Sequence, residues 1–199
     1  MTEYIVWADC EMTGLDIEKD EICEIAVIVT DEQLKPVDEG IQIVIRPSDA
    51  AMANMGEFVR QMHTDSGLLA ELESGVSLQS AQEQVLSYLG KYISEPKTAP
   101  LAGNSIGTDR MFIIRQMPKL DAFLHYRNID VSSLKELVRR WYPRVYFQLP
   151  KKNGSHRALA DIRESIQELA YYRLAVLVAE PGPDSEKAKQ MAKKVADTI

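Results

Sequence analysis

Residues 22–30, with the sequence ICEIAVIVT, form a nearly continuous run of β-branched and apolar side chains. Such a run is typical of a β-strand. Two shorter apolar runs, at residues 4–10 and 41–45, predict further strands, and turn-forming residues separate the three runs. The beginning of the chain therefore predicts three strands of one sheet.

Helices dominate the part of the chain that follows. Residues 78–93 carry apolar side chains on one side at helical spacing, and Ser77 is suited to cap this helix. The other expected elements are helices at 49–62 and 66–73, a strand at 100–103, a helix at 106–116, a strand at 128–131, a helix from Ser132 or Ser133 to Trp141, an irregular loop at 142–155 and a helix at 158–176. This order predicts an α/β fold in which helices flank a mixed sheet.

The length of 199 residues suits one compact domain followed by a tail. Glu180-Pro181-Gly182-Pro183 ends the last long helix, because proline and glycine interrupt helices. We therefore expect one folded domain over residues 1–178. The C-terminal tail over residues 179–199 is expected to be either helical or disordered.

The formal net charge of −7 argues against a protein that binds long nucleic acid through a broad basic surface. Basic residues are concentrated between Arg127 and Arg163, where nine Lys or Arg and three Asp or Glu give a local charge of +6, so the other residues sum to −13. A basic zone on an acidic chain would suit a small anionic substrate in one pocket. A solvated helix face would give the same pattern.

The two cysteines, Cys10 and Cys23, lie in the apolar strand-like runs and have no metal-binding spacing. Their expected role is core packing in a reducing compartment. The sequence shows no signal peptide and no stretch near the ~20 apolar residues of a membrane span. We expect a cytoplasmic protein with no membrane partner.

Asp9 and Glu11 give the first indication of chemistry. On a strand, side chains two residues apart point to the same face, whereas Cys10 between them points the opposite way, into the core. Two neighbouring carboxylates repel each other unless a positive charge lies between them. A divalent cation meets this need, and oxygen ligands suit Mg²⁺ or Mn²⁺ better than zinc. Acidic residues at strand ends are also common without a metal, so this pair alone is ambiguous.

Three more polar residues could join such a site. His156 and Asp161 are five residues apart, which fits a histidine on the incoming loop and an acid in the first turns of a helix. A histidine beside a metal site can take a proton from bound water near neutral pH. Asp109 follows small residues at a strand-to-helix junction, where backbone amides approach ligands. A surface histidine and a helical first-turn acid are the ordinary alternatives.

The ordered set of Asp9, Glu11, Asp109, His156 and Asp161 resembles the DEDD exonucleases of the histidine-bearing subgroup, which have a ribonuclease H-like fold. The similarity to the oligoribonuclease family within this subgroup is closer still. The supporting segments are DCEMTGL at 9–15, HTDSGL at 63–68, GNSIG at 103–107, HYR at 125–127, DVSSLKEL at 130–137 and residues 156–173. They extend over nearly all of the chain except the tail.

The resemblance implies a 3′→5′ exoribonuclease that uses two metal ions. Asp9, Glu11, Asp109 and Asp161 would hold two divalent ions, Mg²⁺ or Mn²⁺. His156 would be the general base, and the products would be 5′-mononucleotides. The implied substrate is short single-stranded RNA of two to five nucleotides, especially dinucleotides.

The resemblance also implies residues that hold the substrate. Leu15 would wedge against the bases, and His63 would contact the backbone or sugar. Phe58 stands where many relatives have a stacking tryptophan, and an aromatic face remains there. The residues that match a 5′-phosphate site are Ser105, Arg127 and Ser132, with Tyr126 nearby. In relatives the Tyr-Arg-Ser group reaches across from the partner chain, which implies an obligatory homodimer.

The chain departs from the family pattern at two positions, and three other interpretations stay open. Cys10 replaces an aliphatic residue, and Ala160 stands where many relatives have a second acid, which makes Asp161 the only acid there. A DNA proofreading exonuclease or a processor of structured RNA ends would keep the chemistry. A catalytically silent dimer would bind nucleotides or serve as an interaction module. An unrelated phosphoesterase would lack the ribonuclease H-like strand order.

Overall fold

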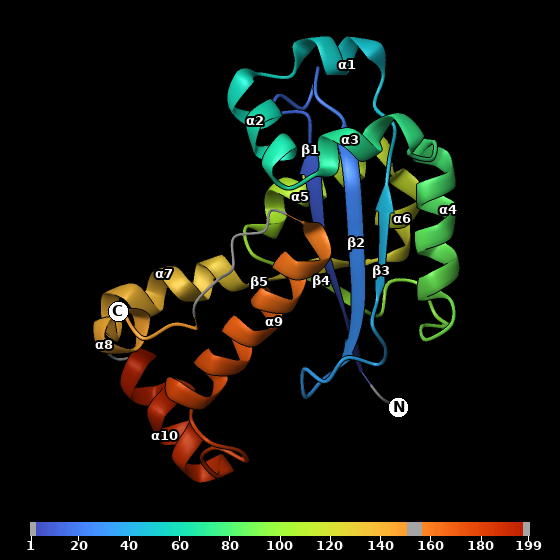
Figure 1. Cartoon of the computed structure of the whole chain (residues 1–199). Coiled ribbons are helices and arrows are strands. Elements are labelled where there is room, and N and C mark those ends of the chain that lie inside the picture. Colours follow the sequence, from blue (N-terminus) through green and yellow to red (C-terminus); the bar gives the residue numbers. More distant parts are fainter. Residues whose placement is uncertain (1–2, 151–156, 197–199) are drawn as a thin grey trace.

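The centre of the protein is a five-stranded mixed sheet in the order β3-β2-β1-β4-β5, seen in a computed structural model that describes residues 3–150 and 157–196 (Figure 1). Strand β1 pairs antiparallel with β2 and parallel with β4, β2 pairs antiparallel with β3, and β4 pairs parallel with β5. The strands span Tyr4–Met12 (β1), Ile22–Asp31 (β2), Ile41–Val44 (β3), Pro100–Gly103 (β4) and His125–Asp130 (β5). This confirms the predicted α/β fold with its ribonuclease H-like mixed sheet.

Helices cover both faces of the sheet (Figure 1). Helices α4, α5 and α6 pack on one face, and α7 and α9 pack on the other. Helices α1, α2 and α3 and the 3₁₀ helix η1 gather near the start of β2. The helices span Asp49–Asn54 (α1), Glu57–Asp65 (α2), Leu68–Glu71 (α3), Leu72–Ser74 (η1), Leu78–Leu89 (α4), Ile106–Gln116 (α5), Pro118–Phe123 (α6), Val131–Trp141 (α7), Pro143–Tyr146 (α8), Ala158–Ala175 (α9) and Ser185–Ala196 (α10).

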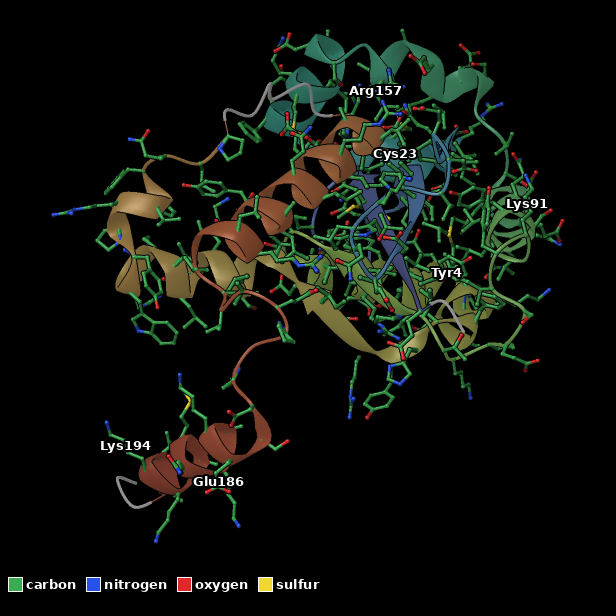
Figure 2. All side chains as sticks on the ribbon, turned by 90° about the horizontal axis from the view of Figure 1, so that it is seen from below. Tyr4, Cys23, Lys91, Arg157, Glu186 and Lys194 are labelled. Carbon is green, nitrogen blue, oxygen red and sulfur yellow. The ribbon has the colours of Figure 1, made fainter. Side chains whose placement is uncertain are left out.

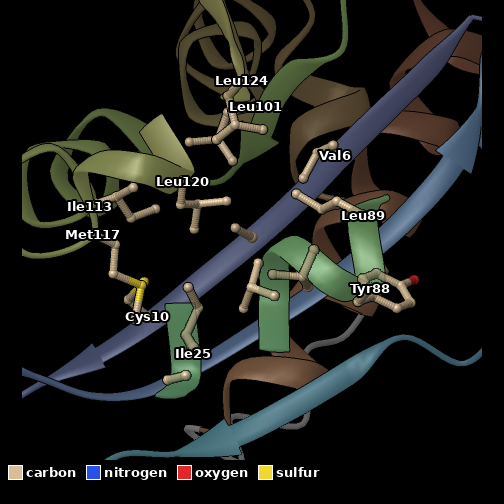
Figure 3. Close-up of a cluster of buried hydrophobic side chains, with 14 of the residues drawn as sticks. Val6, Cys10, Ile25, Tyr88, Leu89, Leu101, Ile113, Met117, Leu120 and Leu124 are labelled. Carbon is tan, nitrogen blue, oxygen red and sulfur yellow. The ribbon is translucent and has the colours of Figure 1, made fainter. Parts of the chain in front are cut away.

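The even-numbered side chains of β1 belong to the largest of three hydrophobic clusters in the described part of the chain. Val6, Ala8 and Cys10 are buried there against side chains from α4 and α5, such as Leu89 and Ile113 (Figure 3). Removing apolar surface from water stabilises the fold by about 25 cal/mol per Å². Cys10 is thus a buried core residue, as predicted, and neither Cys10 nor the buried Cys23 takes part in a disulfide.

The odd-numbered side chains of β1 point to the opposite face, towards α9. Trp7 is fully buried there with Ala26 of β2 and Tyr172 of α9. The indole Nε1 of Trp7 donates to Thr30 Oγ1 at 3.0 Å, so its one polar atom has a partner. Because side chains alternate along a strand, the residues that follow Trp7 on this face are Asp9 and Glu11.

Several helices differ from the sequence-based expectation. The helix predicted at residues 49–62 is divided into α1 and α2, because Met55 and Gly56 adopt extended backbone with ψ of 117° and 156°. The helix predicted at residues 66–73 is α3 followed by η1, and it begins after Gly67, whose φ is 79°. Helix α7 begins at Val131 and not after Ser132 or Ser133; its cap is Asp130, which accepts from Ser132 N.

Two short helices, α6 and α8, were not predicted. Pro118 and Pro143 are their first residues, and proline suits this position because its fixed φ matches the helix and its missing N–H would have no partner. The segment at residues 142–155 was expected to be an irregular loop, and this was wrong for α8. Proline therefore starts a helix at both places.

The tail contains helix α10, so the helical alternative holds for residues 185–196. None of its residues is buried, and α10 lies apart from the sheet in both views (Figures 1 and 2). The domain division at residue 178 stays a prediction. Within residues 3–150 and 157–196, no helix has the length and apolar character needed to cross a membrane.

Candidate active site

Asp9, Glu11 and Asp161 form the centre of the candidate site. The pleat of β1 directs Asp9 and Glu11 to the face that α9 covers, and Asp161 comes from the first turn of α9. Each residue offers a carboxylate oxygen, and the three oxygens lie within 4.8 Å of one another. The predicted convergence of Asp161 with the β1 acids is therefore present in the structure.

Asp109 reaches the same strand from the first turn of α5. The last β1–β4 pair is Trp7 with Ala102, and β1 continues beyond it. Asp109 is buried, and its Oδ1 accepts a hydrogen bond from the backbone N–H of Cys10 at 2.9 Å. Asp109 therefore supplies an acceptor to the β1 backbone between Asp9 and Glu11, although it is outside the group of three oxygens.

Burial and mutual repulsion make these carboxyl groups hard to ionise. Burial raises the pKa of Asp9 well above its usual range, and the charges of Asp109 and Glu11 raise it further. Burial, followed by the charges of Asp161 and Glu24, raises the pKa of Glu11 to about 8. Burial raises the pKa of Asp109 to about 7, against the lowering effect of the Cys10 N–H.

The donor set of this site fits a divalent cation of the hard, oxygen-preferring kind. Its ligand atoms are all carboxylate oxygens, which suit Mg²⁺ or Mn²⁺. A cation would also offset the repulsion and burial that raise the pKa values of Asp9 and Glu11. Asp9, Glu11 and Asp161 are the described residues best placed to hold it.

His63 lies beside Glu11 and is fully buried. Its Nε2 donates to the carbonyl oxygen of Met12 at 2.9 Å, and Cys23 Sγ is 3.7 Å away. Its Nδ1 lies 4.0 Å from Glu11 Oε2 and has no hydrogen-bond partner among the described residues. The ring therefore faces the Glu11 carboxylate, and the substrate contact inferred for His63 stays a prediction.

His156, the predicted general base, lies outside the described residues. The structure resumes at Arg157, the residue that immediately precedes α9. The role of His156 accordingly stays a prediction.

Leu15 and Phe58, both predicted to contact the substrate, are exposed apolar side chains with 76% and 81% of their area exposed. Leu15 follows a turn in which Thr13 Oγ1 donates to Asp20 Oδ1 at 3.0 Å. A side chain at Gly14 would meet the Asp20 carboxylate at 2.3 Å, so this tight turn requires glycine. Phe58 lies on α2, the helix that carries His63.

Ser105 and Ser132, both predicted to hold a phosphate, lie together beside the ends of β4 and β5. Ser105 Oγ donates to Ser132 Oγ at 3.1 Å, and Ser105 has a left-handed φ of 52°. Ser132 Oγ donates to Asn104 Oδ1 at 3.0 Å, and Asn104 Nδ2 donates to Ser165 Oγ at 2.8 Å. Because Ser165 Oγ donates to the carbonyl oxygen of Asp161, hydrogen bonds connect the serine pair with the acid-bearing helix.

Within one chain, Tyr126 and Arg127 lie away from the pair formed by Ser105 and Ser132. Arg127 is three residues before Asp130, which is about 10 Å along a strand. It lines a surface cavity together with Tyr4, the first residue of β1. The Arg127 guanidinium carbon is 5.4 Å from the centre of the Tyr126 ring. The structure therefore brings Ser105 and Ser132 together but leaves Tyr126 and Arg127 nearer the other end of β5, beside the start of β1.

Sequence reasoning missed two residues beside the acid site, Glu24 and Arg157. Glu24 is fully buried on β2, and Arg157 forms an ion pair with it at 2.9 Å. A single carboxylate inside the apolar run of β2 was the available signal, because a buried charge requires a partner.

Comparison with known proteins agrees with this geometry. The model of the family described as Exonuclease (RNase T) matches residues 6–169, so the fold and the acid site define the chain as a nuclease of the exonuclease class. The oligoribonuclease of Streptomyces griseus is 59% identical over 98% of each chain. That of Leifsonia xyli subsp. xyli is 56% identical over 98% of this chain and 95% of its own. The protein belongs to the oligoribonuclease family.

Solved structures with the same fold are more distant in sequence. Exonuclease I from Methylocaldum szegediense has a TM-score of 0.63 and 17% identity over 87% of this chain. A zinc-bound complex of E. coli ExoI with single-stranded DNA has a TM-score of 0.67 and 12% identity over 88% of this chain. The chain spans about 41% of the length of both proteins. These likenesses establish the ribonuclease H-like fold.

Proposed function

We propose that the protein removes nucleotides from the 3′ end of short single-stranded RNA and releases 5′-mononucleotides. The observation that carries this proposal is the convergence of Asp9, Glu11 and Asp161, whose oxygens lie within 4.8 Å of one another at the end of β1. Relatives that share more than half of the sequence over nearly its full length are named oligoribonucleases, which supports short RNA as the substrate. We propose a length of two to five nucleotides. Dinucleotides are the preferred members of this class.

In this proposal Asp9, Glu11, Asp109 and Asp161 hold two divalent ions, Mg²⁺ or Mn²⁺. Bound ions of this kind neutralise charge at a phosphate and make a water molecule more acidic. The carboxylates are held partly or fully away from solvent, where electrostatic interactions are stronger than in water. His156 accepts the proton of the attacking water as general base.

The exposed side chains around the acids select the length of the substrate. Leu15 and Phe58 present apolar area that can stack on or wedge between two bases. His63, whose Nδ1 lies 4.0 Å from Glu11 Oε2, contacts the backbone or sugar of the substrate in this proposal. The hydroxyl groups of Ser105 and Ser132, which are hydrogen-bonded to each other, receive the 5′ phosphate and so limit the distance to the acids.

The active form in this proposal is a homodimer. Tyr126 and Arg127 lie near the start of β5, whereas the acids lie at the end of the parallel strand β1, so in this proposal they serve the phosphate site of the partner. A guanidinium suits this role because its fork of donors matches phosphate oxygens. The apolar side chains available for contact between two copies include those of Trp141, Tyr142 and Phe147, which are exposed. The free, buried cysteines suit the cytoplasm as the compartment.

The proposal is tested by a time course with 5′-phosphorylated RNA of two, five and about twenty nucleotides, in Mg²⁺ or Mn²⁺. The control is Asp161→Ala, prepared and purified in the same way. We expect the dinucleotide to disappear fastest and the control to be inactive. Preference for the longest RNA would favour a general exonuclease, and the absence of any cleavage would favour a nucleotide-binding dimer.

A further inference from the structure

Glu24 is a buried carboxylate next to the acid site that the proposed chemistry does not use. In the antiparallel β1–β2 pairing it lies directly opposite Glu11, so both side chains share one face of the sheet. Its side chain is fully buried. Although its charge raises the pKa of Glu11, Glu24 is outside the group formed by Asp9, Glu11 and Asp161.

Both oxygens of Glu24 are engaged by other groups. Oε1 accepts from Arg157 Nη2 at 2.9 Å, from Arg157 Nε at 3.1 Å and from Gln42 Nε2 at 2.8 Å. Oε2 accepts from the backbone N–H of Ala158 at 2.9 Å. These bonds hold the carboxylate at the start of α9.

The bond to Ala158 makes Glu24 the cap of α9. Arg157 occupies the N-cap position of this helix, and its own side chain makes no capping hydrogen bond. The first N–H groups of a helix need acceptors from elsewhere, and a carboxylate there also favours the helix dipole. The cap therefore comes from a neighbouring strand and ties the beginning of α9 to β2.

Arg157 extends this connection to a third element. Its Nη1 donates to Glu71 Oε1 at 2.9 Å, and its Nη2 donates to Glu71 Oε2 at 3.1 Å. Glu71 belongs to α3, and Figure 2 labels Arg157 where α9 begins, close to the helices that cover this end of the sheet. One guanidinium thus joins β2, α3 and the start of α9 with paired, directional hydrogen bonds.

We propose that Glu24 is a positioning residue that, through Arg157 and the Ala158 N–H, holds the first turn of α9 so that Asp161 meets Asp9 and Glu11. Asp161 is four residues after Arg157, about 6 Å along the helix, so a shift at the cap moves its carboxylate directly. Arg157 also follows His156 in the chain, so the same connection fixes the residue next to the proposed base. The activity readout of this inference rests on the proposed function, whereas its metal-binding readout does not.

The test compares Glu24→Gln and Arg157→Lys with a matched control, Glu39→Gln. Glu39 also pairs with an arginine of α9, Arg163, at 2.7 Å, but it is exposed and distant from the cap. Three quantities are measured for each variant: kcat and KM on a 5′-phosphorylated dinucleotide, and Mn²⁺ affinity by titration without RNA. Circular dichroism verifies folding, and Arg157→Lys, which retains the charge, covers the case in which Glu24→Gln does not fold.

We expect Glu24→Gln and Arg157→Lys to lower kcat and to weaken Mn²⁺ binding by about 10-fold to 100-fold, the usual effect of disturbing residues that orient metal ligands. KM should change by less than about two-fold, because a change at the cap of α9 affects the acids and not the substrate contacts. Glu39→Gln should match the wild type, because Glu39 does not take part in the cap. A folded Arg157→Lys with wild-type kcat and Mn²⁺ affinity would overturn the inference. If no protein cuts RNA while Glu24→Gln still weakens Mn²⁺ binding, the proposed function fails and the positioning role stands.

Discussion

Asp109 and Glu24 are buried, and each has its carboxylate bonded to a backbone N–H, whereas Leu15 and Phe58 expose 76% and 81% of their area. The acids are held by contacts within the chain, before any ligand binds. The two apolar side chains have most of their surface available for a ligand. The comparison separates two roles. Packing within the fold positions the carboxylates for the proposed reaction, and exposed side chains select the substrate.

Replacing a central acid should give the largest loss of activity. Asp9→Asn keeps the shape of the side chain but removes one charge, and we expect dinucleotide cleavage to fall by about 10³-fold or more. The metal-free variant should be more heat-stable than the wild type, because the half-buried Asp9 carboxylate lies beside other carboxylates that raise its pKa. Initial rates and thermal unfolding measure the two effects. Lower stability of the variant would contradict this account of the acids.

His156→Ala should give the next largest loss, about 10²-fold to 10³-fold, because the variant lacks the proposed general base. Mn²⁺ affinity should stay within about two-fold of the wild type, since His156 is not among the proposed ligands. Rates are measured together with a Mn²⁺ titration on the same preparation. Wild-type turnover would exclude His156 as the base, and lost Mn²⁺ binding would make it a ligand instead.

The stability of the metal-free protein should depend on pH. The pKa of Glu11 is raised from 4.5 to about 8 and that of Asp109 from 3.8 to about 7, so both bind their protons more tightly in the folded chain. This stabilisation is present at low pH and is lost as the pH rises through the folded values. The melting temperature in EDTA should fall by about 5 °C or more between pH 5 and about pH 8. Added Mn²⁺ should reduce this fall; an identical slope with and without Mn²⁺ would contradict a metal site here.

Arg127→Ala tests the proposed partner contact. We expect kcat/KM on a 5′-phosphorylated dinucleotide to fall by about 10-fold to 100-fold, because a charge-assisted phosphate contact is lost. RNA of about twenty nucleotides should be cut at nearly the wild-type rate. Equal losses on both substrates would argue against a phosphate site.

Mixed dimers sharpen the same test. If Arg127 serves the partner, a dimer of one Arg127→Ala subunit and one Asp161→Ala subunit has one complete site. This site combines the intact acids of the Arg127→Ala subunit with the intact Arg127 of the other subunit. Mixing and re-equilibrating the two impaired proteins should restore dinucleotide cleavage to about one quarter of the wild-type level, since about half of the dimers are mixed and each has one of two sites. No gain over the separate proteins would refute the contribution across the dimer.

Leu15→Ala and Phe58→Ala should have the smallest effects. Loss of stacking or wedging area should raise KM by about five-fold, with kcat nearly unchanged. Because both side chains are exposed, the melting temperature should stay within about 2 °C of the wild type. A large loss of stability in either variant would mean that these residues belong to the packed fold, which would break the distinction between the two regions.

Local patterns predicted the orientation of the acids, whereas their identification as one set came from the family resemblance. The alternation of side chains along a strand predicted that Asp9 and Glu11 share a face and that Cys10 enters the core, and both features are present. The position of Asp161 in the first turn of a helix was also correct. These features depend on neighbouring residues, and the period of a strand or helix fixes them.

Contacts between distant parts of the chain were not predictable in this way. Arg157 and Glu24 are 133 residues apart, and their ion pair depends on the register of β2 and on how α9 meets the sheet. The Asp109 bond to Cys10 depends on where β4 ends beside β1. Such contacts follow from tertiary packing, for which hydrophobic periodicity gives the elements but not their mutual positions.

The most direct test of the central claim is the initial rate of dinucleotide cleavage as a function of Mn²⁺ concentration, for the wild type and Asp161→Asn. The claim is that the carboxylates joined at the end of β1 hold divalent ions for RNA hydrolysis. We predict a rate that rises with Mn²⁺ to saturation in the wild type and stays near zero in the variant throughout the titration. Cleavage by the wild type that persists in EDTA, or a variant that cuts at the wild-type rate, would contradict the claim.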